Sequence, residues 1–406
     1  MRITPDGSVH LTYCTNIHAA DGWPAVFAAL KQFAPALKAR FSPDAPFGVG
    51  LRLSARDARE LIDNGVGPLR TFLEDHGLYV AIINGFPHGS FHRSVVKADV
   101  YAPDWRDPER RRYTSDLVDI LSVLLPERLD GGVSTVPLSY KRWMPEGSKD
   151  DWRQILSNIV DIAAMLVRIE DNLGRRIHLD IEPEPDCVIE TTGETLAFFT
   201  ERLFTYGAGQ LARVLDTGED EARRLLEDHV RVCFDCCHFS VEHEDPAAAL
   251  QAISAAGIGI GRIQLSSALR VDMPDGPNHR QVLAGRLRSF ADSTYLHQVI
   301  RKDGTTLEHF ADLDQALDQP GGGDWRIHFH VPLFTAEYEG LGSTQADVRR
   351  VIEAAVASRV TTHLEIETYT WDVLPDRLKI DLVESIAREY EWVLGCVPGE
   401  ARARAR

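Results

Sequence analysis

Apolar residues recur along the chain in two patterns that alternate with each other. Short runs such as Val230, Val232 and Phe234 place an apolar side chain at every second position, which is typical of a buried strand. Longer stretches such as 150–173 repeat apolar residues every three or four positions, which predicts a helix. Asp245, directly before a proline, has the sequence of a helix N-cap. Strand patterns, most of them followed by helical spacing, occupy residues 9–18, 46–53, 78–89, 132–143, 176–185, 230–235, 258–266 and 362–369.

Strands and helices alternate throughout, and no change of composition marks a domain boundary. We therefore expect one α/β domain, residues 1–396, folded as a (β/α)8 TIM barrel. In the long irregular section 267–323, Asp303-Gly304 stands between two β-type runs, which predicts an inserted hairpin region between the seventh and eighth strands. Residues 397–406 predict a solvated C-terminal tail. A doubly wound open sheet is the alternative, but no Gly-x-Gly-x-x-Gly follows the first strand, which disfavours a dinucleotide-binding version.

The composition narrows the class of protein. The 406 residues include 44 Lys and Arg against 61 Asp and Glu, a net charge of −17. Nucleic-acid binders usually carry a basic surface that displaces counterions from phosphates, so we do not expect a nucleic-acid partner. The N-terminus lacks the apolar core of a signal peptide and no run of about eighteen apolar residues occurs, so we expect a cytoplasmic chain without membrane insertion. The six cysteines are too scattered for a disulfide scaffold, and we expect buried thiols.

Polar residues follow the strand patterns, at the positions that a TIM barrel collects at one end of its sheet. Asp235 and His238 lie three residues apart and could offer an oxygen and a nitrogen to one metal ion. His328 and His330 lie two apart and would share one face of an extended segment. The other polar residues at strand ends are Asn16, His18, Asn84, His88, Glu182, Gln264 and Glu367.

A divalent cation would explain why so many carboxylates gather there. Glu182 and Glu367 end strands that would face each other across a barrel mouth, with Asp235 and Gln264 between them. Unpaired carboxylates repel one another, and a bound cation removes that conflict. The sequence therefore predicts a metal site at this end of the barrel.

Each carboxylate also has a simpler interpretation, a salt bridge with a loop cation such as Lys141 or Arg142. We prefer that interpretation for Glu184 and Glu365. Glu365 precedes Glu367 by two residues and could share its face, so the choice between these two as the ligand stays open.

Blocks spread from residue 11 to residue 371 resemble known families. Ile-Glu-Pro in the fifth strand region, Phe-Asp-Cys-Cys-His in the sixth and Ile-Glu-Thr-Tyr in the eighth resemble metal-binding motifs of the xylose isomerase-like TIM barrels. That superfamily includes sugar isomerases, sugar epimerases and endonuclease IV. The wider chain is similar to the EboE family of metabolite-traffic proteins, through the blocks L-T-Y-C-T-N-I-H-A-A-D-G-W, N-G-F-P-H-G-S-F-H, S-T-V-P-L-S-Y-K and H-L-E-I-E-T-Y-T-W.

The superfamily resemblance implies a divalent metal, Zn, Mn or Mg, and isomerase or epimerase chemistry on a small sugar- or polyol-like substrate. Glu182 and Glu367 would move a proton beside a substrate carbonyl. Gln264 stands where the isomerases have a histidine. The implied metal ligands are Glu182, Asp235, His238, Gln264, His330 and Glu367, with His238 either a ligand or a donor behind one. The implied substrate-binding residues are Asn16, His18, Asn84, His88, Lys141, Arg142 and His328, although Lys141 and Arg142 are equally well interpreted as solvated loop charges.

The EboE resemblance implies a role in processing or moving secondary-metabolite precursors. The expected partners are a small-molecule metabolite and other proteins of the same pathway. Two alternatives stay open. One is an endonuclease IV-like metal-dependent phosphodiester hydrolase, which the block F-D-C-C-H-F and the early His88 resemble. The other is a non-catalytic carrier or scaffold that binds a metabolite.

Overall fold

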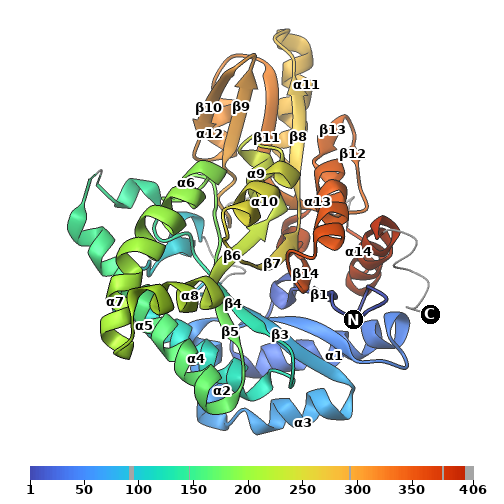
Figure 1. Ribbon diagram of the computed structural model, residues 1–406. Helices are drawn as coiled ribbons and strands as arrows, with labels where there is room; N and C mark the ends of the chain where they lie inside the picture. The colour runs from blue at the N-terminus through green and yellow to red at the C-terminus, as the bar shows by residue number, and fades with distance from the viewer. Residues whose placement is uncertain (91–95, 146, 292–293, 377–378, 398–406) are drawn as a thin grey trace.

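The computed structural model describes residues 1–90, 96–145, 147–291, 294–376 and 379–397, so the expected tail beyond Val397 and the residues Phe91 and His92 lie outside it. The described residues form an eight-stranded barrel in the order β1-β14-β7-β6-β5-β4-β3-β2, with parallel pairing. A parallel bridge between Cys14 and Gly50 brings β1 beside β2 and nearly closes the sheet. The prediction of a (β/α)8 barrel is confirmed. Its strands (Figure 1) are β1 (His10–Tyr13), β2 (Phe47–Arg52), β3 (Leu78–Asn84), β4 (Gly131–Thr135), β5 (Ile177–Ile181), β6 (Val230–Asp235), β7 (Ile260–Leu265) and β14 (His363–Ile366).

Helices separate these strands, and local capping decides where they begin. The Asp107 side chain accepts a hydrogen bond from the backbone N–H of Glu109, so α4 begins at Pro108. None of the described helices is long and apolar enough to cross a membrane. The helices of the barrel are α1 (Trp23–Phe41), α2 (Ala55–Asn64), α3 (Gly67–Asp75), α4 (Pro108–Leu124), α5 (Lys149–Leu173), α6 (Thr192–Ala197), a π-helix (Phe198–Gly207), α7 (Ala208–Leu215), α8 (Glu219–His229), α9 (Cys236–Val241), α10 (Pro246–Ala255), α13 (Gln345–Ser358) and α14 (Leu382–Cys396).

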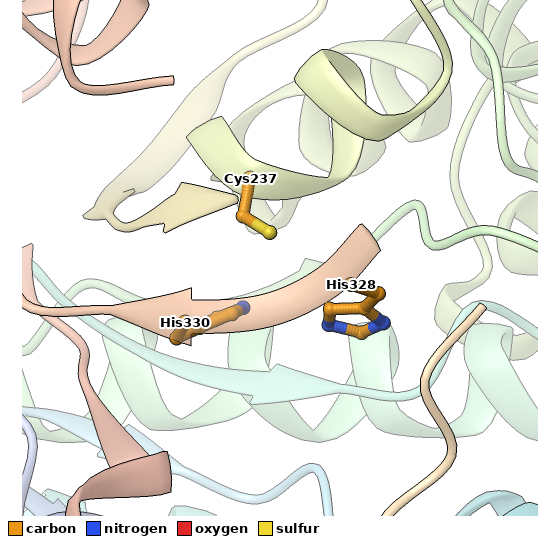
Figure 2. A group of neighbouring side chains, drawn as sticks. All are labelled: Cys237, His328 and His330. Carbon is orange, nitrogen blue, oxygen red and sulfur yellow. The ribbon is translucent and has the colours of Figure 1, made fainter. Parts of the chain in front are cut away.

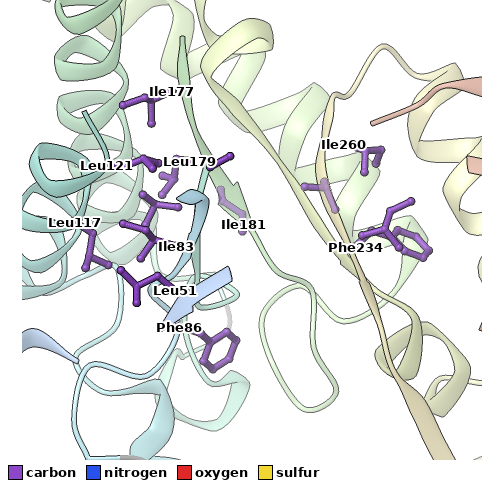
Figure 3. Close-up of a cluster of buried hydrophobic side chains, with 14 of the residues drawn as sticks. Leu51, Ile83, Phe86, Leu117, Leu121, Ile177, Leu179, Ile181, Phe234 and Ile260 are labelled. Carbon is purple, nitrogen blue, oxygen red and sulfur yellow. The ribbon is translucent and has the colours of Figure 1, made fainter. Parts of the chain in front are cut away.

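The main core lies between the barrel strands and the helices around them. Leu117 and Leu121 of α4 belong to the same buried cluster as Ile83 of β3 and Leu179 of β5, and all four side chains are fully buried (Figure 3). Strands of a TIM barrel are covered on both faces, which explains why their sequences are nearly continuous apolar runs. The core therefore fixes the strand ends that carry the polar residues.

The inside of the barrel contains a buried charge network centred on Arg262 of β7. Its guanidinium contacts Asp180 of β5 (Nε to Oδ2, 3.2 Å) and Glu365 of β14 (Nη1 to Oε2, 3.5 Å). It also donates to the backbone carbonyls of Ile83 and Gly132. Burial would lower the pKa of Arg262, but the charges of Asp180 and Glu365 outweigh it and raise the pKa, so this cation stays charged.

A second, six-stranded sheet is inserted between β7 and β14, in the order β10-β9-β11-β8-β13-β12. The hairpin predicted at Asp303-Gly304 is present, with Asp303 paired to Thr306. The sheet extends from Ser267 to Ser343, beyond the predicted range of 267–323. Its elements are β8 (Ser267–Met273), α11 (Pro277–Leu287), β9 (Val299–Asp303), β10 (Thr306–Phe310), α12 (Leu313–Leu317), β11 (Gly323–Val331), β12 (Glu337–Tyr338) and β13 (Leu341–Ser343).

Strand β11 belongs to the inserted sheet, but its end lies beside the polar residues at the mouth of the barrel. Its pairing with β8 shifts register between Ile327 and His330, where the strand is irregular. Such irregularities bend a strand and re-aim its side chains. His328 and His330 of this segment lie with their ring centroids 5.4 Å apart. The inserted sheet thus delivers two imidazoles to a site otherwise built from barrel strands.

Candidate metal centre at the mouth of the barrel

A pocket opens at the C-terminal ends of the barrel strands, with an empty volume of about 530 Å³ including its open mouth. Its polar lining comes from β3, α9, β11 and the segments after β1, β5 and β14. Tyr101, Tyr295 and Tyr369 add aromatic walls. The sequence-predicted residues that line it are Asn16, Asn84, Glu182, His238, His328, His330 and Glu367. The structure therefore brings together seven residues that lie far apart in the sequence.

Asp235 ends β6 and caps the short helix α9, which begins at the next residue, Cys236. Its Oδ1 accepts hydrogen bonds from the backbone N–H groups of Cys237 (2.7 Å) and His238 (3.2 Å) and from the Ser266 hydroxyl (2.6 Å). Its Oδ2 lies 3.9 Å from Nε2 of His330. Burial would raise the pKa of Asp235, but the neighbouring His238 and His330 hold it below its usual value. Asp235 is therefore a carboxylate with one oxygen used by the fold.

Three imidazoles are oriented by bonds at their Nδ1 atoms. Nδ1 of His238 lies 2.8 Å from the carbonyl oxygen of Pro183, and Nδ1 of His330 lies 3.1 Å from that of Glu367. Nδ1 of His328 lies 2.8 Å from Oε1 of Gln298. Since these oxygens only accept, each Nδ1 carries the proton, and a neutral ring then presents its Nε2 lone pair.

The Nε2 atoms meet inside the pocket. Those of His238 and His328 are 3.2 Å apart, so two lone pairs would face each other unless a proton or a cation lies between them. Burial lowers the pKa of His328 well below its usual value, and lowers that of His330 to about 4. Neutral imidazoles of this kind are the form that binds transition metals.

Three glutamates complete the site. Glu367 accepts hydrogen bonds at Oε1 from the amides of Asn16 (2.9 Å) and Asn84 (3.2 Å). Oε1 of Glu182 lies 3.9 Å from Nδ1 of His238. Burial raises the pKa of Glu182 and of Glu367 well above the usual value, and the charge of Asp235 adds to both effects. The smaller contribution, from the charge of Asp235, is the repulsion among carboxylates that the sequence led us to expect.

Glu184 was not expected in the pocket. We preferred for it a salt bridge with a loop cation, and this interpretation is wrong: Oε1 accepts a hydrogen bond from the Tyr101 hydroxyl (2.7 Å) and lies 3.7 Å from Nδ1 of His328. Burial raises the pKa of Glu184 to about 7. The spacing of Glu182 and Glu184 was the available signal, because side chains two apart on an extended segment share a face. Tyr101, Gln298 and Tyr369 carried no comparable signal.

The residues present fit a divalent ion. Oε2 of Glu182, Oδ2 of Asp235 and Nε2 of His330 are buried and have no hydrogen-bond partner among the described residues. Ligand atoms of Asp235, His238 and His330 lie within 4.8 Å of one another, and so do those of Glu184, His238 and His328. Mixed imidazole and carboxylate donors suit Zn or Mn better than Mg.

Cys237 is a further donor beside the two histidines of β11. Figure 2 shows its side chain extending from α9 towards the strand that carries His328 and His330, and the ligand atoms of the three residues lie within 4.8 Å. Burial raises the pKa of the Cys237 thiol well above its usual value, and the charge of Asp235 adds to that. The six cysteines are buried, as predicted.

Gln264 and Glu365 lie deeper than the pocket. Oε1 of Gln264 accepts from the Cys233 thiol (3.3 Å), and Gln264 is paired in register with Asp235. Its role as a metal ligand stays a prediction. Glu365 makes a salt bridge, as we preferred, but with Arg262 inside the barrel rather than with a loop residue. Glu367 is therefore the member of the pair that faces the pocket.

The remaining predicted substrate-binding residues lie away from the pocket lining. The His18 ring stacks on Phe33 (4.4 Å between centroids) and bonds the Tyr13 hydroxyl. The His88 ring packs edge-on against Tyr113, with Nε2 3.6 Å from Glu109. Their binding roles stay predictions.

Lys141 and Arg142 lie on the surface. Both side chains are exposed, and the Lys141 ammonium pairs with Glu190 and Glu194. This arrangement supports the interpretation of Lys141 as a loop charge rather than as a ligand for phosphate.

Solved structures share this architecture. A xylose isomerase-like TIM barrel protein from Mycobacterium smegmatis, in complex with magnesium, has a TM-score of 0.50 and 12% identity, covering 98% of this chain and 97% of its own. A xylose isomerase domain protein from Planctomyces limnophilus has a TM-score of 0.48 and 12% identity, with 96% of each chain covered. No protein-family model matches the sequence, and no curated protein does either. The chain has the xylose isomerase-like TIM-barrel fold.

Proposed function

We propose that the barrel mouth is a divalent-metal centre that isomerises or epimerises a small sugar- or polyol-like metabolite. The observation that carries the proposal is the set of buried carboxylate and imidazole lone pairs at the barrel mouth that have no hydrogen-bond partner among the described residues. Glu182, Asp235, His330 and Glu367 would hold the ion, with His238 beside them.

In this proposal, Glu182 and Glu367 transfer the protons. A divalent ion bound at this site would supply Lewis acidity that polarises a substrate carbonyl. Glu182 and Glu367 lie on opposite sides of Asp235 in the strand order, so one can remove a proton beside that carbonyl and the other can return one. Glu184 is an additional candidate for this role, because its pKa of about 7 suits acid–base exchange at neutral pH. Asn16 and Asn84 orient Glu367 through their amides.

The cellular role that we propose is EboE-like: processing or moving secondary-metabolite precursors, in the cytoplasm, together with other proteins of that pathway. Its support is the set of sequence blocks from residue 11 to residue 371. The acidic balance of −17 argues against the hydrolase alternative, which would act on a polyanion.

The test begins with metal content. The wild-type chain is equilibrated with Zn or Mn, desalted and analysed, beside Glu182→Gln and Asp235→Asn; we expect stoichiometric metal in the first and its loss in both variants. Glu74→Gln on the exposed surface of α3 is the matched control and keeps the metal. The loaded protein is then incubated in D2O with a panel of ketoses, aldoses and their phosphates, and deuterium incorporation at carbon is followed by NMR.

The outcomes separate the candidate functions. Deuterium incorporation that requires Glu182 and Glu367 supports the isomerase. Binding of a metabolite without exchange would favour a carrier, and cleavage of abasic-site DNA would favour the hydrolase. Absence of stoichiometric metal after supplementation would remove the proposal in its metal-dependent form.

A further inference from the structure

A second group of metal-ligating side chains lies at the opposite end of the barrel. Asp130 directly precedes β4, His178 is the second residue of β5, and His363 is the first residue of β14. Parallel strands place their N-terminal ends together, so this group is separated from the pocket by the length of the strands. The three residues offer ligand atoms that lie within 4.8 Å of one another.

The group has the geometry of a small ion site. Nε2 of His178 lies 3.9 Å from Oδ2 of Asp130, and Nε2 of His363 lies 3.4 Å from Oδ1. Ligands bound at about 2.0–2.1 Å around a tetrahedral zinc are roughly 3.3 Å apart, so ligand atoms that lie within 4.8 Å of one another would have to draw together by up to about 1.5 Å. Both imidazoles are buried, while Asp130 is 24% exposed and gives an ion a path from solvent.

The His178 ring is oriented by a carboxylate at its Nδ1 atom, an arrangement that is common for histidines that bind metals. Its Nδ1 lies 2.5 Å from Oδ1 of Asp180, which also contacts Arg262. Because a carboxylate accepts, Nδ1 carries the proton and Nε2 keeps its lone pair. That Nε2 faces Asp130 and has no hydrogen-bond partner among the described residues. A carboxylate behind the distal nitrogen fixes the tautomer and raises the basicity of the ligating one.

His363 also keeps one nitrogen free for a ligand. Its Nε2 lies 3.0 Å from the backbone carbonyl of Asp130, and its Nδ1 is a buried atom without a hydrogen-bond partner in the described part of the chain. Because the carbonyl oxygen only accepts, Nε2 carries the proton and the unused lone pair is on Nδ1; binding an ion through Nε2 would exchange the carbonyl bond for the ion.

We infer that Asp130, His178 and His363 bind a second divalent ion, of the zinc type, that ties together the N-terminal ends of β4, β5 and β14. Two imidazole nitrogens and one carboxylate oxygen favour Zn²⁺ over Mg²⁺ or Ca²⁺. The partial exposure of Asp130 leaves the fourth position to water. At this end of a TIM barrel, such an ion stabilises the fold.

Arg231 allows a test in which a substitution is expected to strengthen ion binding rather than weaken it. Its Nη1 lies 3.0 Å from Oδ2 of Asp130, so its charge competes with a cation for the same oxygen. Removing this charge should tighten ion binding, by about tenfold. If the cluster were only a salt-bridge network, removing Arg231 would weaken the fold and leave ion binding unchanged.

The experiment is done in chains whose metal site at the barrel mouth has been removed by Asp235→Asn. Chains carrying Asp235→Asn, alone and combined with Asp130→Asn, are stripped of metal, equilibrated with Zn²⁺, desalted and analysed for metal. We expect the combined variant to hold one ion fewer per chain. We also expect Zn²⁺ to raise the melting temperature by a few degrees only where Asp130 is intact. Equal metal content in the two chains would overturn the inference.

Two further chains complete the design. In the Asp235→Asn background, Arg231→Gln should bind Zn²⁺ more tightly, measured by competition with a chromophoric chelator. This chain retains all three proposed ligands, so it decides the question even if Asp130→Asn fails to fold. Unchanged or weaker affinity would contradict the inference. Arg153→Gln, which removes an exposed arginine of α5, is the control and should leave the affinity unchanged.

Discussion

The two carboxylate oxygens of Asp235 have different surroundings, because Oδ1 is bound by backbone and hydroxyl donors while Oδ2 lies beside the His330 ring. Three donors from α9 and Ser266 occupy Oδ1, while Oδ2 points toward His330 without a described hydrogen-bond partner. Helix capping therefore fixes the direction of the free oxygen before any ion is bound. Because His238 belongs to the same turn, the sequence spacing alone was enough to place both residues in one site.

The side-chain amides of Asn16 and Asn84, which donate to Glu367, lead to a prediction for a single residue. Asn84→Ala removes one of two hydrogen bonds to Oε1 of Glu367 and leaves that oxygen less firmly oriented. We expect metal affinity at the barrel mouth to fall about 10- to 100-fold, the usual effect of losing such a partner. Competition with a chromophoric chelator measures it, with the exposed Asn64→Ala as control. An unchanged affinity would show that Asn84 does not support the ligand.

The shifted pKa values predict that metal binding releases protons. Burial and the charge of Asp235 raise the pKa of Glu182 and of Glu367, so the metal-free chain keeps protons on these two carboxyl groups to a higher pH than an exposed glutamate does. A cation must displace them, so affinity should rise with pH. Calorimetry in buffers of different ionisation enthalpy should show that protons are released as the ion binds. Binding without proton release would contradict this electrostatic picture.

At the residue scale, the sequence predicted the position of a side chain where the residue lies directly at the end of a strand. It assembled Glu182, Asp235 and Glu367 because β5, β6 and β14 end on one side of the barrel. It could not exclude His18, whose ring turns back to stack on Phe33. Side-chain direction after the strand depends on packing that spacing does not reveal.

At the scale of elements, α14 holds the segment that carries Glu367. Glu389 of α14 accepts hydrogen bonds from the Thr368 hydroxyl (2.6 Å) and from the backbone N–H of Leu333 (3.2 Å). One carboxylate thus links the end of β14 to the segment after β11. Since these two segments supply Glu367 and His330, the helix positions both sides of the pocket.

Glu389 predicts a pH dependence of stability. Burial raises its pKa from 4.5 to about 7. A raised pKa means that the stabilisation is complete below pH 4.5 and is lost as pH rises through 7. Over that range the wild-type chain should lose about 3 kcal/mol more unfolding free energy than Glu389→Gln. Urea unfolding of metal-free protein at several pH values measures this, with Glu74→Gln as control; parallel curves for wild type and Glu389→Gln would contradict it.

The elements were predictable to different degrees. The barrel strands and the β9–β10 hairpin follow from apolar runs and from Asp303-Gly304. The rest of the inserted sheet does not, because β12 and β13 are only two and three residues long and pair with distant segments. Such pairing depends on the three-dimensional path of the chain rather than on local pattern.

At the scale of the whole molecule, Arg262 joins strands from around the barrel. It starts on β7 and contacts Asp180 of β5, Glu365 of β14 and carbonyls of β3 and β4. It is fully buried. The network lies among the strands whose ends form the pocket. The apolar patterns that predicted the strands did not indicate that an arginine would be buried among them.

Removing Arg262 should therefore destabilise the entire barrel. Arg262→Met leaves two buried carboxylates without their cation, which typically costs about 3–5 kcal/mol. Chemical denaturation measures the loss, and Arg153→Met at the exposed surface should cost less than about 0.5 kcal/mol. A similar stability for both variants would mean that Asp180 and Glu365 are satisfied in another way.

The central claim, a divalent ion held at the barrel mouth, is tested most directly by locating the ion. Crystals grown with Zn or Mn and measured at the absorption edge of the metal should give an anomalous peak within about 2.0–2.3 Å of ligand atoms from Glu182, Asp235, His330 and Glu367. Well-ordered side chains at these four residues, with no anomalous peak among them, would contradict the account.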